Sequence, residues 1–260
     1  MKNGFWIFVA VFVALGGSWC GFVLAPELQL GGAKQTTILN SSDAYPIGRP
    51  GEANQGLSVY RANGCAACHT EQVRQTGIAC NVELMDAGKN PEAVTNLISS
   101  LVLTNLTKEV ADKAADQITA AGGKMEIHIV ATGSDIARGW GMRQSVAEDF
   151  LHDQPVQLGS LRAGPDLSNI GVRDPDMNWQ LVHLYAPASE VKDSSMPPFR
   201  YLFEVCKIGN AASPDALVFP KESGPPAGYE VVPKPEAKEL AAYLLSLHAN
   251  VPLYSAPFTP

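Results

Sequence analysis

The stretch with the clearest chemical meaning is Cys65-Ala-Ala-Cys68-His69, in which a histidine directly follows two cysteines that stand two residues apart. A thioredoxin-like redox pair would follow a strand and would not require the histidine. A structural zinc site would need a second ligand pair at metal spacing, and the sequence contains none. Cys-x-x-Cys-His is instead the attachment signature of a c-type haem. We therefore predict one covalently bound haem c, with thioether bonds from Cys65 and Cys68 and with His69 as an axial iron ligand.

A haem iron of this kind usually takes methionine or histidine as its second axial ligand. Met196 lies in Ser-Ser-Met-Pro-Pro, residues 194–198, where two prolines stiffen an extended loop. A weak thioether ligand must be presented at a set distance, which a stiff loop does well. We expect Met196 to bind the iron opposite His69, and His183 to be a packing residue. Two filled axial positions leave no site for a substrate, so the sequence predicts an electron carrier without catalysis of its own.

Two amphipathic segments are predicted, one before the haem motif and one after Met196. Gly56 and Tyr60 share one face of a short predicted helix before the haem motif. Pro235 opens a second helix near the C-terminus, with an apolar stripe of Leu240, Tyr243, Leu244 and Leu247. In small c-type cytochromes the first and last helices cross, with a small residue of one against an aromatic residue of the other. We expect the same crossing here.

The N-terminal residues 5–24 form an uncharged run of about the length that crosses a bilayer as a helix. A cleaved signal peptide is the alternative, but the small residues that could precede a cut are followed at once by Pro26. A lipoprotein cut before Cys20 would need a small residue where Trp19 stands. We expect a retained single-pass anchor in the cytoplasmic (inner) membrane, with Lys2 inside and the haem domain on the periplasmic side. The net charge of −7 argues against nucleic acid as a partner.

The order of several blocks resembles the membrane-anchored mono-haem subunit (subunit II) of cbb3-type cytochrome c oxidases. The blocks are the anchor, the haem motif and residues 138–150, 158–173, 183–187 and 195–197. The resemblance implies a haem that takes electrons from a donor c-type cytochrome or sister c-type subunit and passes them to the large haem–copper subunit, which reduces oxygen. It also implies contact with membrane lipid through the anchor. A free-standing tethered cytochrome c and a ligand-sensing or peroxidase haem protein remain alternatives.

The resemblance to c-type cytochromes also suggests contacts around the haem. In those proteins a Gly-Pro-x-Leu segment passes beside the proximal histidine, and the proline carbonyl accepts the other imidazole N–H. Pro165 occupies that place in this sequence. Arg138, Arg143 and Arg173 are candidates for pairing with the haem propionates, with ordinary surface positions as the alternative.

Residues 77–137 form a longer segment than this family usually has after the haem motif. Residues 81–85 and 124–130 are predicted strands, and residues 91–102 and 107–121 are predicted helices. The β-α-α-β pattern loosely resembles the C-terminal domain of the bacterial ribosomal stalk protein. We expect a haem-free module that either contacts another subunit or is a solvated decoration, and it leaves open whether the partner oxidase is a typical cbb3 enzyme.

The expected fold is mainly α, a class I-like cytochrome c domain with a transmembrane helix and an inserted β-α-α-β subdomain. Cys80 and Cys206 both lie in the exported region, where a disulfide between them is expected. The predicted division is an anchor (1–24), an irregular linker (25–54), a cytochrome c domain (55–250, interrupted by 77–137) and a tail (251–260).

Overall fold

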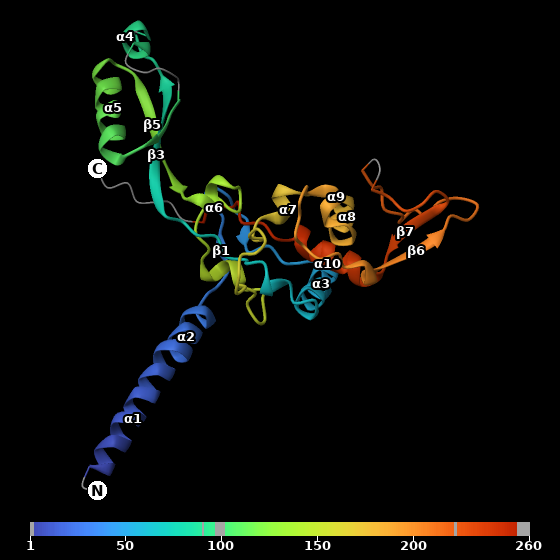
Figure 1. The fold of residues 1–260 in the computed structure, drawn as a ribbon. Coiled ribbons are helices and arrows are strands. Elements are labelled where there is room, and N and C mark those ends of the chain that lie inside the picture. The colour runs from blue at the N-terminus through green and yellow to red at the C-terminus, as the bar shows by residue number, and fades with distance from the viewer. Residues whose placement is uncertain (1–2, 90, 97–101, 221–222, 254–260) are drawn as a thin grey trace. The chain divides into compact units, whose positions relative to one another are not determined.

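The computed structural model describes residues 3–89, 91–96, 102–220 and 223–253 (Figure 1). Helices account for 40% of the described residues and strands for 16%, so the described structure is mixed α/β rather than mainly α. The chain divides into two compact units: unit 1 is residues 1–48 with 146–156, and unit 2 is residues 49–145 with 157–260.

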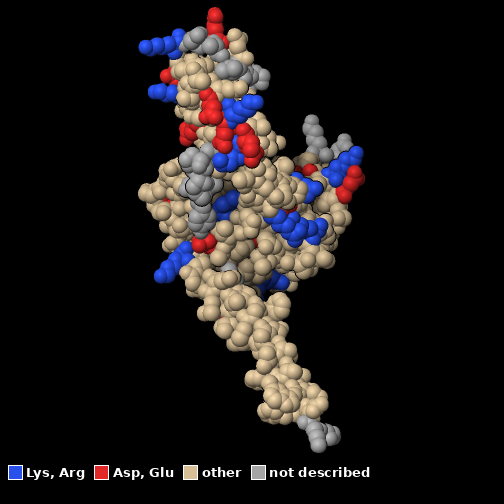
Figure 2. All heavy atoms as spheres, turned by 90° about the vertical axis from the view of Figure 1, so that its left-hand side faces the viewer, with Lys and Arg blue, Asp and Glu red and all other residues tan. Residues whose placement is uncertain are grey.

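Unit 1 begins with a long apolar helix, built from α1 (Gly4–Trp19), a π-helical turn η1 (Cys20–Leu24) and α2 (Ala25–Gly31). Its 26 residues Gly4–Gln29 are long and apolar enough to cross a membrane. The surface of α1 in Figure 2 carries no charged side chain. The irregular linker predicted from residue 25 was therefore wrong for residues 25–31. The π-helical turn comes directly before Pro26, which has no N–H to donate to the preceding turn.

The rest of unit 1 is short. Strand β1 (Thr36–Thr37) pairs antiparallel with β2 (Ala44–Tyr45), and a 3₁₀ turn, η3, covers Ala147–Phe150. The buried Tyr45 donates its hydroxyl hydrogen to Asp149 Oδ1 at 2.8 Å. This hydrogen bond ties the β1–β2 pair to the segment that returns more than a hundred residues later.

In unit 2, helix α3 (Gly51–Ala62) crosses helix α10 (Pro235–Leu245), which confirms the predicted crossing. The two helices meet at Gly56, where a Cβ would lie 1.9 Å from the Glu239 carbonyl oxygen and 2.8 Å from Tyr243 Cβ. The rings of Tyr60 and Tyr243 lie 5.2 Å apart. The Tyr243 hydroxyl also donates to the buried Glu71 carboxylate, with oxygen–oxygen distances of 2.9 and 3.0 Å. The crossing thus holds the segment just after the haem motif.

Replacing Gly56 by alanine is expected to destabilise the protein. Overpacking costs about 1–3 kcal/mol, whereas alanine in place of glycine gains roughly 1 kcal/mol of helix propensity, and here the obstacle is a backbone carbonyl that cannot rotate away. The denaturation midpoint of the full chain in detergent, followed by circular dichroism, should fall. Gly51→Ala is the matched control in the same helix, since nothing lies within 4 Å of its Cβ position. Equal midpoints for the two variants would contradict the close crossing.

The remaining elements of unit 2 outside the insert are short. They are η2 (Cys65–Ala67), α7 (Ile170–Arg173), α8 (Met177–Tyr185), α9 (Pro187–Glu190), η4 (Arg200–Leu202) and the strands β6 (Phe203–Lys207) and β7 (Tyr229–Pro233). The antiparallel β6–β7 hairpin was not predicted. It places Phe203 and Val231 in the same core cluster as α3, α8 and α10. The alternation in Tyr-Glu-Val-Val-Pro buries Val231 on one face, which is a strand signal that the sequence analysis missed.

The insert forms a three-stranded antiparallel sheet in the order β4-β3-β5, with two helices (Figure 1). Its elements are β3 (Gly77–Asp86), α4 (Pro91–Thr95), β4 (Val102–Leu106), α5 (Lys108–Ala120), β5 (Lys124–Thr132) and, directly afterwards, α6 (Ser134–Ala137). Helices α4 and α5 contribute Val94, Ala111 and Ile118 to a core shared with the sheet. The insert therefore has a hydrophobic core of its own.

The predicted β-α-α-β order of the insert was incomplete. The expected helix over residues 91–102 ends at Thr95, and residues 97–101 lie outside the described residues. Val102 instead begins β4, which pairs with the central strand β3. Strand pairing stabilises β4 across about twenty residues of sequence, a contact that a local pattern does not reveal. The predicted α5 is confirmed, with Thr107 preceding it and Gly122 in the left-handed region after it.

The predicted disulfide between Cys80 and Cys206 is wrong, because both thiols are free. Cys80 is 3% exposed and packs in the core of the insert. Cys206 lies on the exposed surface of the β6–β7 hairpin, with its Sγ 3.7 Å from Glu230 Oε1. A disulfide needs Cβ atoms about 4 Å apart, a condition that a thiol buried in the core of the insert and a thiol exposed on the β6–β7 hairpin do not meet.

Candidate haem site

The haem motif follows helix α3 directly and folds as a single tight turn. Gly64 has a φ of 68°, the left-handed conformation that ends the helix and turns the chain into η2. The His69 and Cys68 N–H groups both donate to the Cys65 carbonyl oxygen, at 3.0 and 3.1 Å. Burial raises the pKa of the Cys65 thiol to about 12, whereas Cys68 is exposed. The turn thus presents two unbridged thiols and an imidazole from five consecutive residues.

His69 is oriented by the proline that the sequence analysis singled out. Its Nδ1 lies 2.8 Å from the Pro165 carbonyl oxygen, which can only accept, so Nδ1 carries the hydrogen. This tautomer leaves the Nε2 lone pair available for a metal ion. Burial lowers the pKa of His69, which keeps the ring neutral at neutral pH. The imidazole is therefore in the chemical form that binds iron.

Gly164 allows the proline to approach the ring. A Cβ on Gly164 would lie 2.3 Å from His69 Cε1 and 2.7 Å from its Nδ1, so no other residue fits without displacing the imidazole. The Gly164 N–H donates to the Cys68 carbonyl oxygen at 2.9 Å, and the Leu167 N–H donates to the Thr70 carbonyl oxygen at 2.8 Å. Residues 164–167 therefore run beside the haem motif and form the wall behind His69.

Met196 lies far downstream of the haem motif in the sequence but packs against the same hydrophobic cluster as Cys65. It is half-buried and packs, as Cys65 does, against the cluster that includes Leu57, Leu184 and Leu244. The Met196 N–H donates to Ser194 Oγ at 3.3 Å, and the Phe199 N–H donates to the Leu184 carbonyl oxygen at 2.8 Å. The first hydrogen bond lies within the loop that contains Pro197 and Pro198, and the second fixes that loop to the end of α8.

His183 is half-buried and has one buried ring nitrogen without a hydrogen-bond partner in the described residues. Its ring stacks on Trp179 at 4.9 Å with a 4° angle between the planes, and its buried Nδ1 has no hydrogen-bond partner within the described part of the chain. Burial, with a contribution from His69, lowers its pKa to about 4. His69 acts electrostatically on the His183 ring, whose Nδ1 has no hydrogen-bond partner in the described residues, and Gly164 closely approaches the His69 ring. These features fit a site built around a flat apolar group with an iron ion. The residues present thus fit a haem.

The three candidate propionate arginines occupy different surroundings. Arg173, at the end of α7, donates from Nη1 to the Asp166 carbonyl oxygen at 3.0 Å and so lies on the wall behind His69. Arg143 donates from Nε to the Val251 carbonyl oxygen at 2.9 Å, which ties it to the C-terminal segment. Arg138 places its guanidinium 5.0 Å from the Trp140 ring centroid. The structure therefore brings Arg173 into contact with residues 164–167.

The sequence analysis missed a polar group next to this wall. Arg162 contacts two buried carboxylates, Asp135 and Asp166, although neither was singled out as a site residue. A signal existed for one of them, since Asp166 directly follows the glycine–proline pair. Asp135 comes from the far end of the insert, and nothing in the local sequence connects it to the haem motif.

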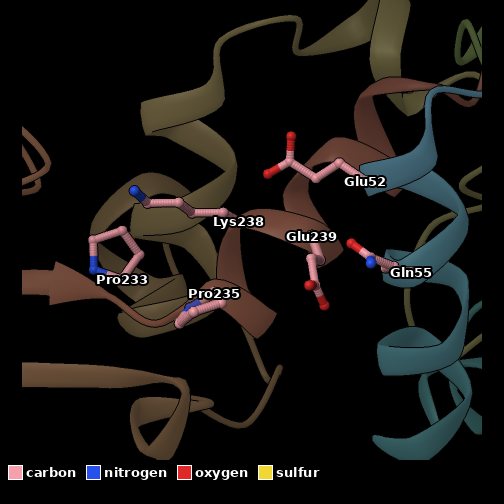
Figure 3. A pocket seen from close by; sticks show the side chains of 6 residues that line it. All are labelled: Glu52, Gln55, Pro233, Pro235, Lys238 and Glu239. Atoms are coloured by element: carbon pink, nitrogen blue, oxygen red, sulfur yellow. The ribbon is translucent and has the colours of Figure 1, made fainter.

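A separate depression of about 430 Å³ lies at the outer side of the α3–α10 crossing (Figure 3). It is lined by Glu52 and Gln55 of α3 and by Pro233, Pro235, Lys238 and Glu239. None of the candidate haem residues borders it. The charged side chains in Figure 3 make it a solvated hollow between two helix ends rather than a site for an apolar group.

Comparison with known families gives one match. Residues 129–220 match the model of a family described as cytochrome c oxidase, mono-heme subunit/FixO. This part of the chain is therefore similar to the mono-haem subunits of cytochrome c oxidase that form the FixO family. Such a subunit carries one haem c and transfers electrons within a cbb3-type cytochrome c oxidase complex. No curated protein matches the sequence.

The matched range contains some of the predicted haem-site residues but not others. Pro165 and Met196 lie within residues 129–220, whereas the haem motif at residues 65–69 precedes them. Most of the insert also lies outside the matched range. The resemblance to the mono-haem oxidase subunit stated from the sequence is therefore confirmed, and the haem-attachment motif supports it independently.

Proposed function

We propose that this chain is a mono-haem oxidase subunit of the FixO family, in which Cys65 and Cys68 would attach the haem c and His69 and Met196 would bind its iron. The observation that carries this assignment is the hydrogen bond from His69 Nδ1 to the Pro165 carbonyl oxygen, 2.8 Å long, which aims Nε2 away from the wall. When bound, the haem supplies a one-electron centre. The protein's residues hold that centre: the thiols attach it, Pro165 and Gly164 orient the proximal ring, and Arg173 stabilises the wall.

The order and crossing of the helices support the same assignment. Helices α3 and α10 cross at Gly56, the haem motif follows α3 immediately, and Met196 lies on the loop between α8 and η4. The thioether is a weak, neutral ligand that favours the reduced iron and so raises the potential. With both axial positions filled, the domain exchanges electrons without binding oxygen itself.

The proposed path of the electrons is from a donor c-type cytochrome, or a sister c-type subunit, to the large haem–copper subunit. The apolar helix α1 would contact membrane lipid and hold the haem domain on the periplasmic side of the cytoplasmic membrane. The uncharged run of α1 and the absence of a convincing cleavage site support a retained anchor. The short β1–β2 pair would then lie just outside the bilayer.

Purification through a tag on this chain tests the assignment to a complex. In mild detergent we expect a large haem–copper subunit to co-purify in equal amounts, and the preparation to consume oxygen when supplied with a reduced c-type cytochrome. A free-standing tethered cytochrome c would instead elute alone, with its haem but without oxygen consumption. A sample that elutes alone and binds carbon monoxide in its reduced native form would favour a ligand-sensing protein and contradict the proposal.

A further inference from the structure

Arg162 holds the residues next to both ends of the His69–Pro165 hydrogen bond. Its Nε donates to Thr70 Oγ1 at 2.8 Å, and Thr70 is the residue after His69. Its Nη2 donates to Asp166 Oδ2 at 3.3 Å, and Asp166 is the residue after Pro165. One planar guanidinium thus connects the segment that carries the proximal ligand His69 with the segment that carries its hydrogen-bond acceptor, Pro165.

Asp166 completes this connection through hydrogen bonds of its own side chain. Its Oδ2 accepts hydrogen bonds from Thr70 Oγ1 at 2.6 Å and from the Gln72 N–H at 2.9 Å, and its Oδ1 accepts from the Ser168 N–H at 2.9 Å. The Thr70 hydroxyl donates to Asp166 while it accepts from Arg162, so its orientation is determined. The Asp166 side chain is fully buried, and a buried carboxylate persists because it is paired and hydrogen-bonded.

The same arginine also reaches the insert. Its Nη1 donates to both oxygens of Asp135, at 2.9 and 2.8 Å. Asp135 is 2% exposed and lies in α6, directly after the last strand of the insert, and it also accepts from the Arg74 N–H at 2.8 Å. Burial raises the pKa of Asp135, but the hydrogen bonds from Arg162 and from the Arg74 N–H outweigh this and hold its pKa below the usual range. The end of the insert is thereby tied to the segment that follows the haem motif.

We propose that Arg162 is a positioning residue for the proximal histidine, and that Asp135, supplied by the end of the insert, anchors it. This inference rests on the proposed ligation of the haem by His69. The guanidinium fixes the distance between residues 69–70 and 165–166, and hence the strength of the hydrogen bond from His69 to Pro165. A strong bond of this kind makes the imidazole more basic and stabilises the oxidised iron. The end of the insert is then part of the frame that sets the reduction potential.

The test uses two substitutions that leave the net charge unchanged. Arg162→Lys keeps the cation but loses the fork that reaches four partners, the Gln72 carbonyl oxygen included. Thr70→Val removes the hydroxyl between Arg162 and Asp166. We expect both to weaken the His69–Pro165 bond. In the full chain, poised against a fixed redox couple, the ratio of reduced to oxidised haem should rise by at least about threefold. The low-spin electron paramagnetic resonance signal should shift as well.

The control is Lys238→Gln, which breaks an exposed ion pair with Asp215, 2.8 Å long, in the same domain. It should leave both readouts as in the parent protein. Unchanged potentials and unchanged resonance signals in the two test variants would overturn the inference, as would an equal change in the control. If Arg162→Lys fails to accumulate with haem, Thr70→Val decides. A parent protein without covalent haem would contradict the proposed function itself, and this is measured first.

Discussion

Replacing both Cys65 and Cys68 by alanine is expected to abolish covalent haem attachment. The two thiols come from one turn beneath His69, and together they supply every thioether bond that we propose. The double variant, produced with a working haem-ligation system, should show no haem-stained band after denaturing electrophoresis, whereas the parent chain should show one. Each single variant keeps one thioether, so its pyridine haemochrome band should move to longer wavelength with part of the haem retained.

The matched control is Cys206→Ala, because Cys206 is also a free thiol but lies on the exposed β6–β7 hairpin. It should retain haem at the parent level. Covalent haem in the double variant, or its loss in the control, would show that attachment does not depend on the turn after α3. A colourless parent protein would remove the basis for assigning any ligand.

Met196→Ala is expected to open the sixth coordination position of the iron. The oxidised protein should lose its sulfur-to-iron absorption band in the far red, and the reduced protein should gain carbon monoxide binding. The potential should fall on the order of a tenth of a volt or more, since axial ligands set haem potentials over a span of about 0.8 V. Visible spectroscopy and a redox titration of the full chain measure all three effects.

Met142→Ala serves as the control for this experiment. Met142 is 45% exposed and its backbone N–H donates to the Ala249 carbonyl oxygen, so the substitution leaves the loop of Met196 intact. It should keep the absorption band and remain unreactive towards carbon monoxide. If Met196→Ala behaved in the same way, another residue would have to complete the coordination, and the buried, unpartnered His183 would be the first to replace.

The local parts of the site could be predicted from sequence because their chemistry is contiguous. The cysteines and His69 are contained in five residues, and the Pro-Pro pair after Met196 restricts its own backbone. The partner of His69, Pro165, is 96 residues away, and it was found through a segment typical of c-type cytochromes. The observed Nδ1–carbonyl contact agrees with that expectation, while the iron ligands themselves stay predictions.

The insert shows where local patterns fail. Its regular strands β3 and β5 and the helix α5 follow from alternation and from glycines after the helix. Strand β4 does not, because a short apolar run is compatible with a helix or a strand until a neighbouring strand supplies hydrogen bonds. The local pattern also did not determine on which face of the sheet Cys80 lies. Cys80 is buried in the core of the insert and is a free thiol, so the expected disulfide does not form.

The amino-acid sequence by itself predicted the attachment motif, the apolar N-terminal helix and the two separate helices α3 and α10, since each depends on residue types within a few positions. Tertiary structure alone decided that Arg162 joins Asp135 to Asp166, that the buried Nδ1 of His183 has no hydrogen-bond partner in the described residues, and that Cys80 and Cys206 are both free thiols. Buried ion pairs and orphaned polar atoms depend on which distant segments exclude water from them, and no local pattern records that.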